Sequence, residues 1–317
     1  MASSERDARK GGDPRPPFVS IIVPAFNAEG TISDCLHALV EQEYPRDRYE
    51  ILAVDNNSQD RTAEIIRKFP VTYVSETKQQ SSYAARNRGI AKASGEILAF
   101  TDADCIADRM WASHAVERFR DDTVGCVAGH IGNTPPDTVV QEYLLDVLAQ
   151  TDFLSHPFLP YAVTANVFYR KAVIERIGPF DGTWVSGGDA DLAWRMQLQT
   201  PYRLVYCEDA TIQHMHRRTH RAHFRQRWTW GYGAVLLYER YRLAFQSKGL
   251  GYDVKALASD YRQLLKMSWR CGIAWWKWRR RSISRKDWDF TVLDWLSELG
   301  TRVGRIHGSV QRRIFYL

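Results

Sequence analysis

The stretch Glu96–Asp104 (EILAFTDAD) decides the fold and indicates the chemistry. Its first six residues form a largely apolar run, which is typical of a strand buried on both faces. Asp102 and Asp104 follow where this strand ends, separated by one residue. Mg²⁺ and Mn²⁺ prefer such hard oxygen ligands and often bridge a carboxylate to a diphosphate. The pair predicts a metal site, with solvated loop acids as the alternative.

The chain before this stretch alternates between strand and helix patterns. Strands are expected at Val19–Pro24, Tyr49–Asp55 and Val71–Ser75, and helices at Gly30–Glu43, after Asn56–Asp60 as far as Phe69, and at Tyr83–Ala93. This alternation predicts a largely parallel sheet with helices on both faces. Ligands gather at the carboxyl ends of such strands, where both Asp55 and the Asp102/Asp104 pair lie.

The chain after residue 106 has a looser pattern. Strands are expected at Val124–Gly129, Tyr161–Tyr169 and Tyr202–His214, a helix at Asp189–Gln199, and mostly helix from Thr219 onward. We therefore expect a boundary near residue 217, between an α/β domain (18–217) and a helical, basic, tryptophan-rich region (218–317). Residues 1–17 are polar, lack the apolar core of a signal peptide, and are expected to be disordered.

Three further segments carry candidate functional residues. His214 and His216 end the last expected strand, and histidine can complete the shell of a first-row metal; a basic surface segment is the alternative. Asp189, in Gly187–Leu192 (GGDADL), begins a helix and could accept a proton from a hydroxyl, or simply cap the helix. The loop Asp55–Ser58 (DNNS) could hydrogen-bond a nucleobase or ribose, or form an ordinary turn.

In this order and spacing, these segments resemble glycosyltransferase family 2, whose members have the GT-A fold. The likeness covers about residues 18–235. It is carried by VSIIVPAFNAEGTISDCLHALVEQ (19–42), EILAVDNNSQDRT (50–62), SSYAARNRGIAKASGEILAFTDADC (81–105), TANVFYRKAVIERIGPFD (164–181) and GGDADLAWR (187–195). The resemblance implies a mixed, mostly parallel sheet flanked by helices, with residues 18–217 as the catalytic domain and a helical, basic C-terminal appendage.

The resemblance also implies roles for individual residues of the donor and metal sites. Residues expected to bind the donor are Pro24, Ala25, Asn27, Asp55 (near the base), Arg86 and Asp102. Asp102 would contact ribose or metal, and Asp104 would be the main metal ligand. His214, ahead of His216, would be the late metal ligand.

Asp189 would be the base in an inverting displacement, with Asp191 as the alternate base. Many family members have Glu-Asp where this chain has Gly188-Asp189, so the assignment depends on Asp189 alone. The implied reaction moves a sugar from a nucleoside-diphosphate sugar to an acceptor hydroxyl with Mn²⁺ or Mg²⁺. The acceptor would be lipid-linked or a glycan of the cell envelope.

Processive members carry a (Gln/Arg)-x-x-Arg-Trp motif, but Phe224–Trp228 (FRQRW) begins with Phe. Together with the lack of any apolar stretch of 18 residues, this predicts transfer of a single sugar rather than polymer synthesis. The alternatives are a non-catalytic module that binds a nucleotide sugar or glycan and, more distantly, a nucleic-acid-binding protein. No GxGxxG follows the first strand, so a dinucleotide-binding oxidoreductase is set aside.

Composition bears on location and partners. The net charge is +6 over 317 residues, and the five scattered cysteines suggest no disulfide framework, so we expect a cytoplasmic protein with an anionic partner. Residues 261–286 contain nine Lys or Arg, four Trp and no acid. This pattern fits a segment lying on the inner face of a membrane, or a helix whose tryptophans pack on the catalytic domain. The arginines of the acid-free segment 210–238 could also face a diphosphate.

Overall fold

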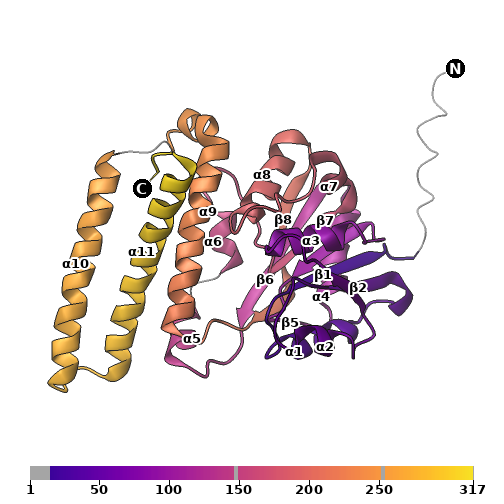
Figure 1. Ribbon diagram of the computed structural model, residues 1–317. Coiled ribbons are helices and arrows are strands. Elements are labelled where there is room, and N and C mark those ends of the chain that lie inside the picture. The colour runs from indigo at the N-terminus through magenta and orange to yellow at the C-terminus, as the bar shows by residue number, and fades with distance from the viewer. Residues whose placement is uncertain (1–14, 146–148, 251–253, 317) are drawn as a thin grey trace.

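The computed structural model describes residues 15–145, 149–250 and 254–316, so most of the N-terminus expected to be disordered lies outside the described residues. One eight-stranded sheet has the order β3-β2-β1-β4-β7-β6-β8-β5 (Figure 1). Its strands are β1 (Val19–Ala25), β2 (Tyr49–Asp55), β3 (Thr72–Ser75), β4 (Ile97–Thr101), β5 (Cys105–Ala107), β6 (Val124–Asn133), β7 (Asn166–Arg170) and β8 (Arg203–His214). The pairs β1–β2, β1–β4, β2–β3 and β6–β8 are parallel, and β7 and β5 pair antiparallel with their neighbours. The predicted mixed, mostly parallel sheet is confirmed.

Helices cover both faces of the sheet (Figure 1). Those associated with it are α1 (Ile32–Val40), α2 (Thr62–Ile66), α3 (Ser82–Ile90), α4 (Trp111–Glu117), α5 (Val139–Leu144), α6 (Gln150–Leu154), α7 (Lys171–Ile177) and α8 (Gly188–Gln199). Side chains alternate along β1 between two buried clusters: Ile21 and Val23 pack with α1, and Ile22 packs with residues of α3 and α8. Burial on both faces explains why these strands are continuously apolar.

One strand is shorter than the sequence predicts. The strand expected at Tyr161–Tyr169 begins only at Asn166, because the preceding segment is a loop. Its Val163 N–H donates to the side chain of Gln150 at 3.0 Å rather than to a neighbouring strand. The loop brings Thr164 to the start of α8, where its hydroxyl donates to Asp189.

The C-terminal region consists of three long helices, α9 (His220–Ser247), α10 (Val254–Arg279) and α11 (Arg285–Arg312) (Figure 1). Helices α9 and α11 approach closely because two glycines face the opposite backbone. A Cβ at Gly231 would lie 2.1 Å from the Thr301 carbonyl oxygen, and one at Gly304 would lie 2.0 Å from that of Trp228. Helix α10 lies outermost, against α11.

Helix α9 also packs on the sheet domain. Its Tyr241 and Phe245 lie edge-on to Trp194 of α8. The expected boundary near residue 217 thus precedes a helix that packs both on the sheet domain and on α11. Within the parts of the chain that the structure describes, none of the helices is both long enough and apolar enough to span a bilayer.

Candidate active site

A cleft opens at the carboxyl ends of β1 and β4, where three adjoining cavities share Phe26 and Ser82. Their volumes are about 850, 610 and 250 Å³. Asp102 and Asp104 line the first cavity, and Asp102 and Asp189 line the second. The structure thus brings the expected metal-binding acids and the expected base into one cleft, of the size that binds a small-molecule ligand.

The acidic pair lies beside His214 because β5 pairs with β8. In that antiparallel pair Cys105 lies opposite His214, and His214 Nε2 is 3.6 Å from Asp104 Oδ1. Ligand atoms of Asp104, Cys105 and His214 all lie within 4.8 Å of one another. Burial, together with the charges of Asp104 and Asp102, raises the pKa of the Cys105 thiol well above its usual value. Beside this thiol, Asp104 and His214 offer a carboxylate and an imidazole as donors.

This donor set fits Mn²⁺ or Mg²⁺ better than a soft metal, and the imidazole favours Mn²⁺. The Nδ1 atom of His214 is buried and makes no hydrogen bond within the described residues. The ring thus has bonding capacity that its protein neighbours do not use. The residues present fit the cation that the resemblance implies.

His216 has a different environment from His214. The two rings are edge-to-face with centroids 4.8 Å apart, but His216 Nε2 lies 2.6 Å from the side-chain oxygen of Asn133. Burial, and secondarily the neighbouring His214, lowers the pKa of His216 to about 4. Nε2 of His216 is thus engaged by Asn133, whereas Nε2 of His214 lies directly beside Asp104.

Two arginines hold the acids. Arg86 of α3 is buried and donates to Asp102 Oδ1, and Arg217, half exposed, donates to Asp104 Oδ2 at 3.3 Å. Arg217 lines both larger cavities, where its guanidinium could pair with phosphate oxygens. Sequence reasoning noted the arginine-rich segment but did not single out Arg217, whose position is set by the end of β8.

Two of the four expected nucleoside-binding residues line the smallest cavity. Pro24 and Ala25 line it together with Asn56, whereas Asn27 lines the largest cavity. Asn27 has φ +48° and its side-chain oxygen accepts the N–H of Gln59 at 2.8 Å. A short polar side chain suits this left-handed conformation, and the bond joins the loops that follow β1 and β2.

Asp55 is buried beneath these loops. Its carboxylate accepts the Ser58 N–H at 3.1 Å and the Tyr73 hydroxyl at 3.2 Å. Asp55, expected to contact the base, lines none of these three cavities and instead orders the loop that carries Asn56. Asn56 was noted in the sequence only as part of that loop.

Asp189 lies in the first turn of α8, at the edge of the second cavity. The Thr164 hydroxyl donates to Oδ1 at 3.1 Å, and the Thr164 N–H lies 3.3 Å from Oδ2. Burial raises the pKa of Asp189, although Arg86 and Thr164 oppose this shift. A carboxylate with a raised pKa, fixed in orientation and open to a cavity, suits a general base.

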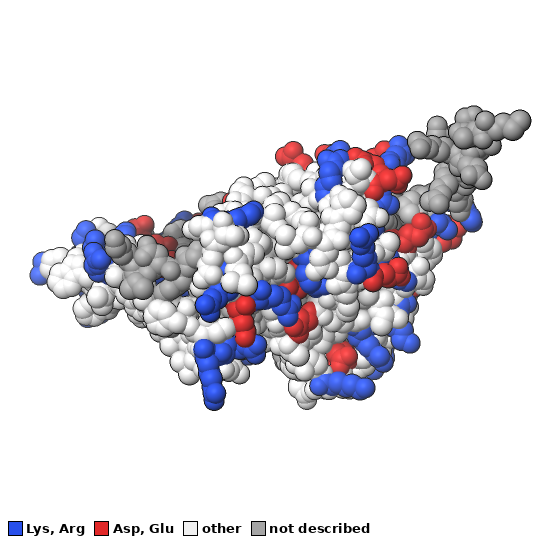
Figure 2. Space-filling view, turned by 90° about the horizontal axis from the view of Figure 1, so that it is seen from above, with Lys and Arg blue, Asp and Glu red and all other residues white. Residues whose placement is uncertain are grey.

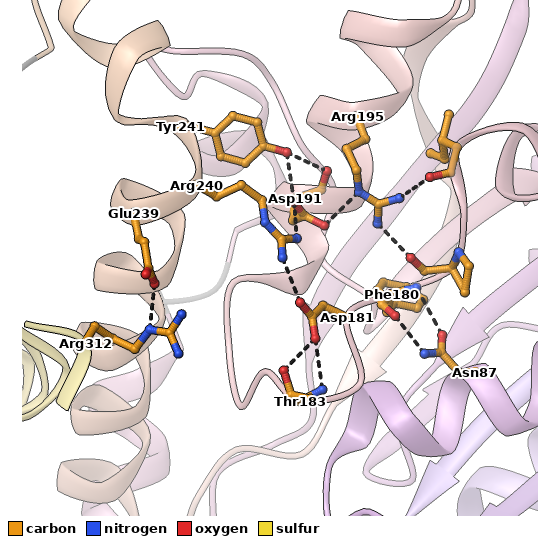
Figure 3. Close-up of polar contacts among 12 residues, drawn as sticks. Asn87, Phe180, Asp181, Thr183, Asp191, Arg195, Glu239, Arg240, Tyr241 and Arg312 are labelled. Carbon is orange, nitrogen blue, oxygen red and sulfur yellow. Dashed lines mark hydrogen bonds and ion pairs between the residues drawn. The ribbon is translucent and has the colours of Figure 1, made fainter. Parts of the chain in front are cut away.

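Asp191 does not reach the cleft, which corrects its assignment as the alternate base. It is fully buried, and its oxygens accept hydrogen bonds at 2.9 Å from each of Arg195, Arg240 and Tyr241 (Figure 3). Residues two apart on a helix point to nearly opposite sides, so Asp189 and Asp191 cannot both face one cavity. Asp191 instead joins α8 to α9.

The chain belongs to glycosyl transferase family 2. The sequence model of that family matches residues 20–178, which is half of the chain. Glycosyltransferase AglE of Haloferax volcanii is 38% identical over 201 residues, covering 61% of this chain and 65% of that protein. The probable glycosyltransferase YdaM of Bacillus subtilis is 27% identical over 233 residues, covering 68% of this chain and 55% of that protein. The chain thus spans less than two thirds of the length of these relatives.

Among solved structures, the mannosyltransferase PcManGT from Pyrobaculum calidifontis, in complex with GDP-Man and Mn²⁺, has a similar fold. The TM-score is 0.58 at 22% identity, covering 92% of this chain and 88% of that one. This similarity confirms the predicted GT-A-type architecture, including helices that follow the sheet domain.

Proposed function

We propose that this protein transfers a single sugar from a nucleoside-diphosphate sugar to an acceptor hydroxyl, with inversion and with the help of Mn²⁺ or Mg²⁺. One observation carries the proposal: a single cleft holds the Asp102/Asp104 pair, His214 beside it, and Asp189. Family membership supports the reaction class. The mannosyltransferase of similar fold contains GDP-Man and Mn²⁺, which supports a divalent metal here.

Asp104 and His214 would hold the cation, and Asp102 would contact it or the ribose. When bound, such an ion offsets the negative charge of the departing nucleoside diphosphate. Arg217 adds a positive charge at the same place. Pro24, Ala25 and Asn56 would contain the nucleoside in the smallest cavity, with Asp55 and Asn27 holding the loops around it.

Asp189 would take the proton from the acceptor hydroxyl as that oxygen attacks the anomeric carbon from the side opposite the diphosphate. Thr164 fixes the orientation of the Asp189 carboxylate. The raised pKa of Asp189 makes this carboxylate a stronger base. Asp102, the other carboxylate that lines this cavity, is paired with Arg86, so Asp189 would act as the base and the acceptor oxygen would displace the diphosphate directly, with inversion.

We also propose that the enzyme works at the cytoplasmic face of a membrane on a lipid-linked or cell-envelope acceptor. Trp269, Trp275 and Trp276 of α10 are exposed by 71%, 51% and 48%, and the Arg280 guanidinium lies 3.8 Å from the centroid of Trp276. Trp278 instead stacks on Trp288 of α11. Basic side chains beside exposed tryptophans suit an anionic interface.

The test is thermal unfolding with nucleoside diphosphates and nucleotide sugars, with and without Mn²⁺. A ligand that binds only the native state raises Tm by mass action. We expect one nucleotide to stabilise the wild type only with metal, and Asp104→Ala to abolish this. Asp122→Ala is the matched control, since Asp122 is fully exposed just before the start of β6.

The stabilising nucleotide sugar is then incubated with acceptor preparations and Mn²⁺. Stabilisation without transfer to any acceptor would favour a non-catalytic binding module, and no stabilisation by any nucleotide would reject the donor site. Long polymer among the products would contradict single-sugar transfer.

A further inference from the structure

A cavity of about 520 Å³ lies between α9, α11 and the loop Asp181–Gly187, next to the cleft, with which it shares Val185. We propose that it binds a neutral sugar unit of the acceptor, at a distance from the hydroxyl that reacts. This inference rests on the proposed transferase function, because it concerns how that enzyme holds its acceptor. All of its lining residues follow residue 178, where the family match ends.

One wall of the cavity is aromatic. Trp228 of α9 stacks on His307 of α11 with centroids 5.4 Å apart and planes 16° apart, and Tyr232 lies beside them. Trp184 also lines the cavity. A pyranose ring has an apolar C–H face, which packs on flat rings, and a rim of hydroxyls, which requires polar groups nearby.

Those polar groups are present, and their charges cancel. Arg240 pairs with Asp181 at 2.7 Å, and Arg312 pairs with Glu239 at 2.6 Å (Figure 3). Acidic and basic side chains are likewise interspersed over the middle of the face shown in Figure 2. An anionic ligand would compete with carboxylates already bound to both guanidinium groups. A neutral polyhydroxyl ligand would instead use the remaining N–H groups and lone pairs.

The cavity is connected to the catalytic cleft by one residue. Val185 is 48% exposed and lines this cavity as well as the cavity that contains Asp189. Arg240 also binds Asp191, two residues beyond Asp189. The wall of the cavity and the start of α8 are therefore held in a fixed relation, so that a glycan lying across Val185 would direct a hydroxyl toward Asp189.

The test measures binding of neutral trisaccharides by saturation-transfer NMR and calorimetry, without donor or metal. The probes are maltotriose, cellotriose, chitotriose and mannotriose, with glucose 6-phosphate as the anionic probe. Two variants act on exposed side chains, so that folding is preserved: His307→Ala removes half of the stacked pair, and Gln311→Trp fills the cavity. Arg242→Ala is the control, since Arg242 is exposed on α9 and does not line the cavity.

We expect at least one trisaccharide to bind the wild type, with affinity lowered about three- to tenfold in both cavity variants, as for loss of one aromatic contact. Arg242→Ala and Asp104→Ala should bind it unchanged. The proposal is overturned if no trisaccharide binds at millimolar concentration, if glucose 6-phosphate binds more tightly, or if all variants bind equally.

The two proposals fail in distinguishable ways. Metal-dependent nucleotide binding without trisaccharide binding overturns the cavity assignment and leaves the transferase proposal intact. Trisaccharide binding that depends on His307 in a protein that binds no nucleotide overturns the transferase proposal, while the cavity remains a glycan site.

Discussion

The hydroxyl of Tyr83 accepts the backbone N–H of Gly188 at 3.0 Å, which joins helix α3 to the first residue of α8. The Tyr83 ring occupies the space that a side chain at position 188 would need, since a Cβ there would lie 2.8 Å from the ring. Gly187 has φ +86°, which glycine adopts without strain. The two glycines therefore let α8 begin against Tyr83, with Asp189 at the cavity.

Gly188→Ala should destabilise the protein by about 1–3 kcal/mol, because the new methyl group overlaps the buried Tyr83 ring. Urea unfolding measures this. In a Tyr83→Ala background the same substitution should cost less than about 0.5 kcal/mol, since the overlap is gone. The control is Gly272→Ala on α10, which meets open space and should stabilise by up to about 1 kcal/mol. If Gly188→Ala and Gly272→Ala lowered the free energy of unfolding equally, the steric explanation would be wrong.

Asp189→Asn should lower the transfer rate by about 10²–10⁴-fold while donor binding is unchanged, because an amide cannot accept the hydroxyl proton. The pKa of Asp189 is raised by burial, so in the wild type kcat/KM should increase with pH up to a pKa above the ordinary aspartate value of about 3.9. Below that pKa the base is protonated and inactive. If Asp189→Asn keeps the wild-type transfer rate and the same loss of kcat/KM at low pH, Asp189 is not the base.

Asp191→Asn should act on stability instead. Asp191 is buried between Arg195 and Arg240, and removing its charge leaves Arg195 without its carboxylate and Arg240 with only Asp181. We expect the free energy of unfolding, measured with urea, to fall by about 2–3 kcal/mol. This is near the lower end of the cost of breaking a buried ion pair, because Arg240 is partly exposed. Nucleotide affinity of the folded protein should be unchanged. A selective loss of transfer without a loss of stability would return Asp191 to the list of candidate bases.

His214→Ala should weaken Mn²⁺-dependent nucleotide binding more than His216→Ala does. His214 lies 3.6 Å from Asp104, whereas Nε2 of His216 is engaged by Asn133. Titrating Mn²⁺ at fixed nucleotide concentration and following Tm compares the two variants. The reverse order would make His216 the direct ligand.

Trp269→Ala combined with Trp276→Ala should reduce flotation with vesicles that contain anionic lipid, because both rings are exposed on α10. Binding should also weaken as salt rises, since charge attraction contributes. Leu243→Ala is the control, because Leu243 is an exposed apolar residue on α9. A wild type that stays unbound at low salt would contradict membrane docking.

The sequence by itself determined the features that depend on short stretches of chain. The apolar runs at β1, β2 and β4 predict buried parallel strands because each strand is covered on both faces. The acids follow the strand ends directly, so Asp102, Asp104 and Asp55 could be placed at one edge of the sheet before any contact was known. The helical nature of the C-terminal region was also readable from its pattern.

Only the tertiary structure decided which distant residues meet. Pairing of β5 with β8 brings His214 to Asp104, and helix geometry turns Asp191 away from the side on which Asp189 meets the cavity. The cavity between α9 and α11 depends on the close helix approach at Gly231 and Gly304. Such relations depend on packing between segments far apart in the chain, and the hydrophobic pattern of one segment does not specify which partner covers it.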